Sequence, residues 1–221
     1  MGGANFARGF TSGTAAVAML VLVVGCAPGK WDRSVATEIV TPDIVWDDGP
    51  PAGEWEANEF VKAARAAELG IVLAQNSHDY TIEQLTDHVA PDFIAWLYEN
   101  DLHMLDVGVR VPQINPGPLP LGVMSVTETA DGADVEFCSP SGKWAVYADH
   151  PNPDVDPKNG VTTTISMVRT EDGAILLTET GGVLTECDAT GIAVGRFSPE
   201  PELPDEVPID AVRPPLGYEK E

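Results

Sequence analysis

The sequence predicts one α+β domain in which helices come first and an antiparallel sheet follows. In residues 54–76, apolar side chains recur at steps of three and four, which places them on one face of a helix. Two later β-rich segments each turn on an Asp-Gly pair, which is typical of a hairpin. Helices followed by an antiparallel meander favour a domain with its helices packed on one face of the sheet.

The first helix is expected to bury an alanine-rich face. The residues of this face are Phe60, Ala64, Ala67, Ile71 and Ala74. Gly70 lies in the same helix, where glycine costs about 1 kcal/mol relative to alanine. We therefore expect Gly70 to mark a close contact with another element.

Two shorter helices are predicted next. Thr81 and Gln84 form a capping-box pattern at the start of one, and Pro91 suits the first turn of the other. Their expected inner residues are apolar: Ile82, Leu85, Val89, Phe93, Ile94, Trp96 and Leu97.

The sheet is expected to contain two hairpins. GVMSVTETADGADVEFCS turns at Asp131 and Gly132, and GVTTTISMVRTEDGAILLTET turns at Asp172 and Gly173. In the second hairpin one set of alternating residues should face the core, as in a strand buried on one side. That set is Val161, Thr163, Ile165 and Met167.

Residues 1–25 have the features of a secretory signal peptide. Arg8 is the only charged residue before the apolar run AAVAMLVLVVG, which is shorter than the roughly 20 residues that span a bilayer. Val23 to Cys26 resemble the lipobox of bacterial lipoproteins, which implies a diacylglycerol on Cys26 and cleavage before it. The expected location is the extracytoplasmic face of the cell membrane. The alternative is an ordinary signal peptide with a chance cysteine.

The domain is expected to lie between two unstructured segments. Residues 26–53, rich in proline, glycine and acids, are interpreted as a tether, although TEIV and DIVW within them leave docking on the domain open. Residues 54–197 form the domain. Residues 198–221 are interpreted as a disordered tail, because a Pro- and Glu-rich segment buries little apolar surface.

The charge of the chain excludes some partners. It has 12 lysines and arginines against 35 aspartates and glutamates, for a formal net charge of -23. This balance argues against binding to nucleic acid and against a polybasic membrane patch. A solvated acidic face explains the negative net charge, and an acidic recognition patch is the alternative.

Cys138 and Cys187 are expected to form a disulfide, because an exported chain meets a compartment in which disulfides persist. Closing this loop should stabilise the fold by about 4 kcal/mol in the chain-entropy model. Two buried thiols are the alternative.

Asp101 and His103 are the best candidates for catalysis. Acid-base chemistry needs an acid or a histidine in a pocket, and these two would share a side of an extended segment. The other Asp-His pairs are immediate neighbours and point apart. Solvated loop residues are the alternative interpretation of Asp101 and His103.

Asn152, Asp154 and Asp156 alternate like the first ligands of a calcium loop. The match fails further on, because Pro157 replaces the turn glycine and Thr163 stands where the glutamate belongs. An acidic surface loop is the alternative. Phosphate-loop, GxSxG, HExxH and paired CxxC motifs do not occur, and we expect no cofactor.

Several segments carry a family resemblance. The alanine-rich helix, NSHDYTIEQL, PGPLP, DGADVEFC, the DG hairpin and ECDATGIAVGRF together resemble exported actinobacterial lipoproteins of unknown function with an NTF2-like domain. The resemblance implies a cone, in which a curved antiparallel sheet wraps around N-terminal helices and leaves a pocket. Proteins of this fold include enzymes and pure binding subunits, so the fold does not decide the function.

Three functions follow as hypotheses. The first is a membrane-anchored binding or accessory lipoprotein that holds a small apolar ligand or an envelope protein. The second is a pocket enzyme of the isomerase or dehydratase type that uses Asp101 or His103. The third is a structural or blocking protein of the envelope.

Overall fold

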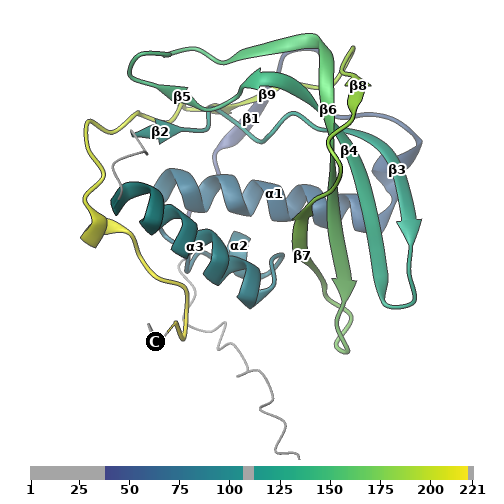
Figure 1. Ribbon diagram of the computed structural model, residues 1–221, viewed down its shortest axis with the longest axis horizontal. Coiled ribbons are helices and arrows are strands. Elements are labelled where there is room, and N and C mark those ends of the chain that lie inside the picture. The colour runs from purple at the N-terminus through teal and green to yellow at the C-terminus, as the bar shows by residue number, and fades with distance from the viewer. Residues whose placement is uncertain (1–37, 107–111, 219–221) are drawn as a thin grey trace, which may run out of the picture. The chain divides into compact units, whose positions relative to one another are not determined.

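The computed structural model describes residues 38–106 and 112–218. The expected signal peptide and residues 26–37 of the expected tether, including the lipidation candidate Cys26, lie outside the described residues. The described part is a mixed α+β domain with a mostly antiparallel sheet and a few helices, as the sequence predicts (Figure 1).

The main sheet has five strands, which are all antiparallel to their neighbours. The strands are β3 (Gly122–Glu128), β4 (Gly132–Lys143), β6 (Asp154–Arg169), β7 (Ile175–Gly181) and β8 (Glu186–Asp188). They are arranged in the order β3-β4-β6-β7, and β8 pairs with the first part of β6. Both predicted hairpins are confirmed as the pairs β3–β4 and β6–β7.

The alternation predicted for β6 holds in its second half only. Ile165 and Met167 are buried, whereas Thr162 is buried in place of Val161. The Thr162 hydroxyl donates a hydrogen bond to the carbonyl of Val183 at 3.0 Å, which satisfies its polar atom in the interior.

The sheet is interrupted in each of its three long ladders. The register shifts between Val123 and Ser125 in the β3–β4 ladder, between Pro140 and Gly142 in the β4–β6 ladder, and between Ser166 and Met167 in the β6–β7 ladder. Such irregularities increase the local twist and bend the strand.

Two small antiparallel sheets lie beside the main one (Figure 1). One pairs β1 (Asp43–Trp46) with β9 (Gly195–Ser198), and the other pairs β2 (Gln113–Ile114) with β5 (Val146–Tyr147). Strand β1 is the DIVW segment of the expected tether. This segment therefore belongs to the domain, which was the possibility that the sequence left open.

The helices are the 3-10 turn η2 (Glu54–Ala57), α1 (Glu59–Ser77), α2 (Glu83–Thr86), α3 (Pro91–Asp106) and the 3-10 turn η3 (Ile209–Ala211). Asn58 caps α1, because its Oδ1 accepts hydrogen bonds from the backbone N–H groups of Phe60 and Val61. The predicted inner face of α1 is buried throughout. This helix contacts β3, β4, β6 and β7, so it lies across the sheet (Figure 1).

Gly70 marks a close contact between α1 and α2, as predicted. A Cβ atom at this position would lie 2.9 Å from the Cα of Leu85 and closer still to the carbonyl of Gln84. Only glycine therefore allows the backbones of the two helices to approach this closely.

The predicted capping box is wrong. Helix α2 begins one residue later than the pattern implies, and Thr81 donates instead to Oδ1 of Asp79 through its backbone N–H and its hydroxyl. The Gln84 amide donates to the carbonyl of Ile39 at 3.0 Å rather than folding back on its own helix. A tertiary contact therefore replaces the local one.

Most of the predicted inner residues of α2 and α3 are confirmed as buried or partly buried. Trp96 is the exception, because 53 % of its surface is exposed. It stacks on Phe93 with ring centroids 5.2 Å apart, and Tyr98 is the aromatic residue of α3 that enters the core.

Residues 199–218 differ from the expected disordered tail. They return to the helices, where Val212 is buried and the ring of Tyr218 packs edge-on against Tyr98. The Tyr218 hydroxyl donates to Glu99 at 2.9 Å, and the Arg213 guanidinium pairs with Asp79 at 3.0 Å. Widely spaced apolar residues are enough to order this segment, because the helical surface on which they pack is already formed.

We predict that Gly70→Ala destabilises the domain although alanine favours helix. The added methyl group forces α1 and α2 apart, and overpacking of this kind costs about 1–3 kcal/mol. Urea unfolding measures the effect. Gly181→Ala is the control, because nothing lies within 4 Å of its added Cβ. Equal stability of the Gly70→Ala variant and the unchanged protein would contradict the close contact.

Candidate functional site

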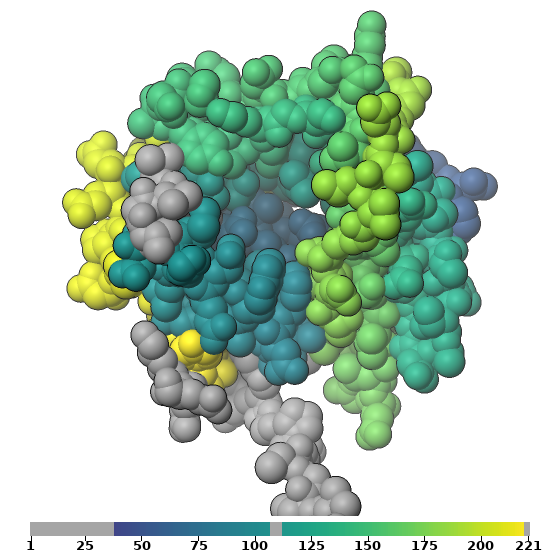
Figure 2. Space-filling view, viewed as in Figure 1, coloured from purple at the N-terminus to yellow at the C-terminus, as the bar shows by residue number. Residues whose placement is uncertain are grey.

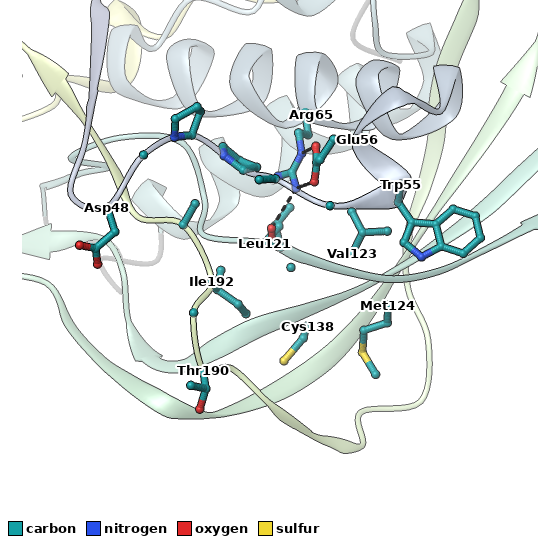
Figure 3. A pocket seen from close by; sticks show the side chains of 18 of the residues that line it. Asp48, Trp55, Glu56, Arg65, Leu121, Val123, Met124, Cys138, Thr190 and Ile192 are labelled. Atoms are coloured by element: carbon teal, nitrogen blue, oxygen red, sulfur yellow. Dashed lines mark hydrogen bonds and ion pairs between the residues drawn. The ribbon is translucent and has the colours of Figure 1, made fainter.

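Three cavities of the described part follow one side of α1. The largest of these three has a volume of about 430 Å³ and lies between the segment 48–53, the start of β3 and residues 190–193. Figure 3 shows Arg65 of α1 beside Glu56 at the edge of this cavity, with Ile192 on the opposite side. Two smaller cavities of about 250 and 240 Å³ follow along the helix.

Arg65 and Glu56 lie where the largest of the three cavities adjoins the next one, since both residues line both cavities. The Nε and Nη2 atoms of Arg65 donate to the two carboxylate oxygens of Glu56 at 2.8 and 2.6 Å. Nη2 also donates to the carbonyl of Leu121 at 3.2 Å (Figure 3). This bidentate pair cancels its own charge, so the largest cavity carries no unpaired charge on its α1 side.

The two smaller cavities are lined mainly by apolar side chains. Those of the 250 Å³ cavity include Ile44, Trp46, Leu69, Leu119 and Leu121, and those of the 240 Å³ cavity include Ile71, Val72, Phe93, Leu97 and Leu119. Figure 2 shows the surface hollowed between α3 and the strands β7 and β8, with atoms of α1 at the bottom. Concave and mostly apolar cavities with few polar groups are typical of small-molecule sites.

Glu68 lines both of the smaller cavities, as does Leu119. It lies on α1 one turn after Ala64 and one turn before Ile71, on the apolar face of the helix. Glu68 is not among the site residues predicted from the sequence. The helical period would have found it, because it places an acid on a face that is otherwise alanine, isoleucine and phenylalanine.

The environment of Glu68 keeps its carboxyl group protonated to an unusually high pH. The side chain is half-buried, and desolvation raises its pKa from 4.5 to about 7. Within residues 38–106 and 112–218 no hydrogen bond or ion pair of this carboxyl group is found. A perturbed acid in a cavity is a physical indication of a functional site.

The two amide side chains that line the 240 Å³ cavity, those of Gln75 and Asn115, are hydrogen-bonded to each other. The Asn115 amide donates to Oε1 of Gln75 at 3.2 Å, and the Asn115 backbone exchanges hydrogen bonds with Asn76. Of the described residues that line this cavity, Glu68 is the one with an ionisable side chain, and these amides do not engage its carboxyl group.

The structure does not bring Asp101 and His103 together. Both lie in α3 rather than in an extended segment, and two residues of a helix separated by one position point to different sides. Asp101 is buried and its Oδ2 lies 3.4 Å from Nδ1 of His78, whereas His103 is exposed. Neither residue lines any of the cavities described above.

The calcium-loop candidates lie at the start of β6. Asn152 and Asp154 are exposed, and Asp156 accepts hydrogen bonds from the backbone N–H groups of Lys158 and Asn159 and from the Asn159 amide. These contacts, led by the Asn159 amide, lower the pKa of Asp156. No group of three or more possible metal ligands is found in the described part of the chain.

The predicted disulfide between Cys138 and Cys187 is confirmed. Cys138 is in β4 and Cys187 in β8, and β6 runs between these strands with Gly160 paired to both. A Cβ atom on Gly160 would lie 2.7 Å from the Cys138 sulfur and 3.0 Å from the Cys187 sulfur. The bridge therefore passes over a position where only glycine leaves room for it.

None of the helices formed by the described residues has both the length and the apolar character that crossing a membrane requires. The chain matches no protein-family model, no curated protein and no solved structure.

We predict that Glu68→Gln stabilises the domain in a pH-dependent way. Between pH 4.5 and about 7 the folded state retains a proton that the unfolded chain has released, so stability falls as pH rises through this window. Glutamine does not ionise, so the variant does not lose this stability. Because Glu68 is half-buried, we expect the free energy of unfolding to be about 1–3 kcal/mol higher in the variant near pH 8.

Urea unfolding near pH 4.5 and near pH 8 measures this gain, which should almost vanish at the lower pH. Glu171→Gln, in the exposed turn between β6 and β7, is the control for the change in net charge. The same gain at both pH values would show that ionisation of Glu68 is not its cause.

Proposed function

We propose that this protein is a cell-envelope lipoprotein whose domain binds a small, largely apolar ligand beside α1. The observation that carries the proposal is the pair of adjoining apolar cavities that share Glu68 and Leu119. Burial of apolar ligand surface there supplies roughly 25 cal/mol per Å². An envelope protein as the partner is less favoured, since the cavities have the dimensions of a small molecule.

We propose further that the domain is an NTF2-like cone. Three features support this. A long helix lies across an antiparallel sheet, irregularities in all three long ladders bend that sheet, and cavities follow the helix. The resemblance to exported actinobacterial lipoproteins leads to the same fold.

Two observations support the proposed location, one from the sequence and one from the disulfide. The lipobox-like segment ending at Cys26 supports a lipid anchor on the extracytoplasmic face of the membrane. A disulfide between Cys138 and Cys187 fits an oxidising compartment outside the cytoplasm. Two or more acyl chains on one residue give stable anchoring, whereas a single chain does not.

A pocket enzyme of the isomerase or dehydratase type is the second candidate. A carboxyl group with a pKa near 7 is suited to acid-base catalysis at neutral pH. Glu68 takes the place of Asp101 and His103 in this hypothesis, because it lines the cavities and they do not. A structural or blocking role is less favoured, because such a domain would fill its interior with its own side chains.

We predict a lipid adduct on a chain that begins at Cys26. Intact-mass analysis of protein extracted from membranes should show this mass, and Cys26→Ser should abolish the adduct and release the protein from the membrane fraction. An unmodified chain that begins at another residue would refute the anchor but would leave the ligand site untouched.

We predict that Ala66→Phe blocks ligand binding without unfolding the domain. Ala66 is half-buried and lines the 250 Å³ cavity, which a phenyl ring would largely fill. Titration with octanol should show at least tenfold weaker binding than to the unchanged protein, equivalent to about 1.4 kcal/mol. Ala95→Phe is the control, because Ala95 of α3 is half-buried and lines none of the described cavities. Equal binding by both variants would place the ligand elsewhere.

A further inference from the structure

Glu68 lies where the two smaller cavities meet. Each cavity alone is below the roughly 300 Å³ at which small-molecule pockets usually begin. A molecule that extends from one into the other has a site of ordinary size. Such a molecule must pass the carboxyl group of Glu68, because this residue lines both cavities.

The charges around this junction can be counted. Among the residues that line the two cavities, the ionisable side chains are Glu56, Arg65 and Glu68. Arg65 directs its guanidinium to Glu56 and to the Leu121 carbonyl, so its charge is already compensated. One acid is left over, and no cation among the described lining residues opposes it.

This imbalance discriminates between classes of ligand. A fatty acid or another apolar anion would place a second negative charge beside Glu68 and would find no cation to bind it. A neutral apolar molecule would bury the carboxyl group further without giving it a partner, which is costly. An ammonium group would supply the missing charge and up to three hydrogen-bond donors.

We infer that the joined cavities bind an apolar molecule that carries a protonated amine, with its ammonium group against the Glu68 carboxylate. This inference rests on the proposed binding function and adds the chemical class of the ligand. The apolar part of the ligand lies among Leu69, Leu119 and their neighbours on either side of the junction. The acidic surface of the chain favours the approach of a cation.

Binding of the amine is coupled to a proton. In the empty cavity Glu68 is about half protonated at neutral pH, because its pKa is about 7. The ammonium group stabilises the carboxylate, so the fraction of Glu68 that is protonated releases its proton to solvent when the amine binds. Amine binding should therefore weaken by about tenfold from pH 8 to pH 6, a range in which an alkylamine stays charged.

The test uses the full chain and three probes with the same alkyl length. Isothermal titration with octylamine, octanol and octanoate near pH 8 should rank octylamine first by at least tenfold and octanoate last. In Glu68→Gln, octylamine should lose this advantage while octanol binding is kept. Glu171→Gln, with the same change of net charge at an exposed site, should behave like the unchanged protein.

The pH dependence needs no variant, so it tests the inference even if Glu68→Gln fails to fold. Octylamine should bind more weakly at pH 6 than at pH 8, and octanol should not. Equal affinity for octylamine and octanol, with no dependence on pH, would overturn the assignment of an amine and leave the apolar site standing. Failure of all three probes to bind would overturn the proposed function and this inference with it.

Discussion

The close packing of α1 against the sheet and against α2 is the constraint on which the other features depend. Alanines at positions 64 and 67 keep the helix close to the strands, and Gly70 lets the backbone of α2 approach it. The helix contacts four strands of the main sheet, so its position is fixed along its whole length. Any side chain directed from α1 toward the cavities is therefore held in place by a rigid element, which favours a preorganised site.

Within one turn of this helix, two charged residues have opposite environments. Arg65 uses its donors on Glu56 and Leu121, and its guanidinium lies 5.7 Å from the centre of the Phe137 ring. Because the N–H groups of Arg65 already donate to these partners, they are not directed to the carboxyl group of Glu68. Desolvation is therefore the dominant influence on the pKa of Glu68. This raised pKa in a cavity is the basis of the ligand site proposed above.

Sequence patterns that act over a few residues predicted the structure better than patterns that compete with tertiary contacts. Local patterns succeeded: the inner face of α1 and both Asp-Gly hairpins were correctly predicted, because periodicity and turn chemistry act over a few residues. Patterns that compete with tertiary contacts failed. Gln84 reaches Ile39 instead of capping its helix, and the segment that contains Val212 is ordered by a surface formed elsewhere in the chain.

The candidate site was only partly accessible from the sequence. The helical face on which Glu68 lies was identified, but the acid on it was not, since an ionisable residue on an apolar face becomes informative only when a cavity is known to adjoin it. Asp101 and His103 were chosen on the assumption of an extended segment, and the continuation of α3 to Asp106 removes that assumption. Helix ends are poorly determined by local sequence, so residues close to them are uncertain candidates.

The placement of the disulfide has a consequence for the edge of the sheet. Cys138 and Cys187 belong to strands on opposite sides of β6, and their sulfurs meet over Gly160. The covalent bond therefore ties β8 to β4 across the strand that lies between them. With this bond intact, the three residues of β8, a strand too short to hold itself by hydrogen bonds alone, cannot leave the edge of the sheet.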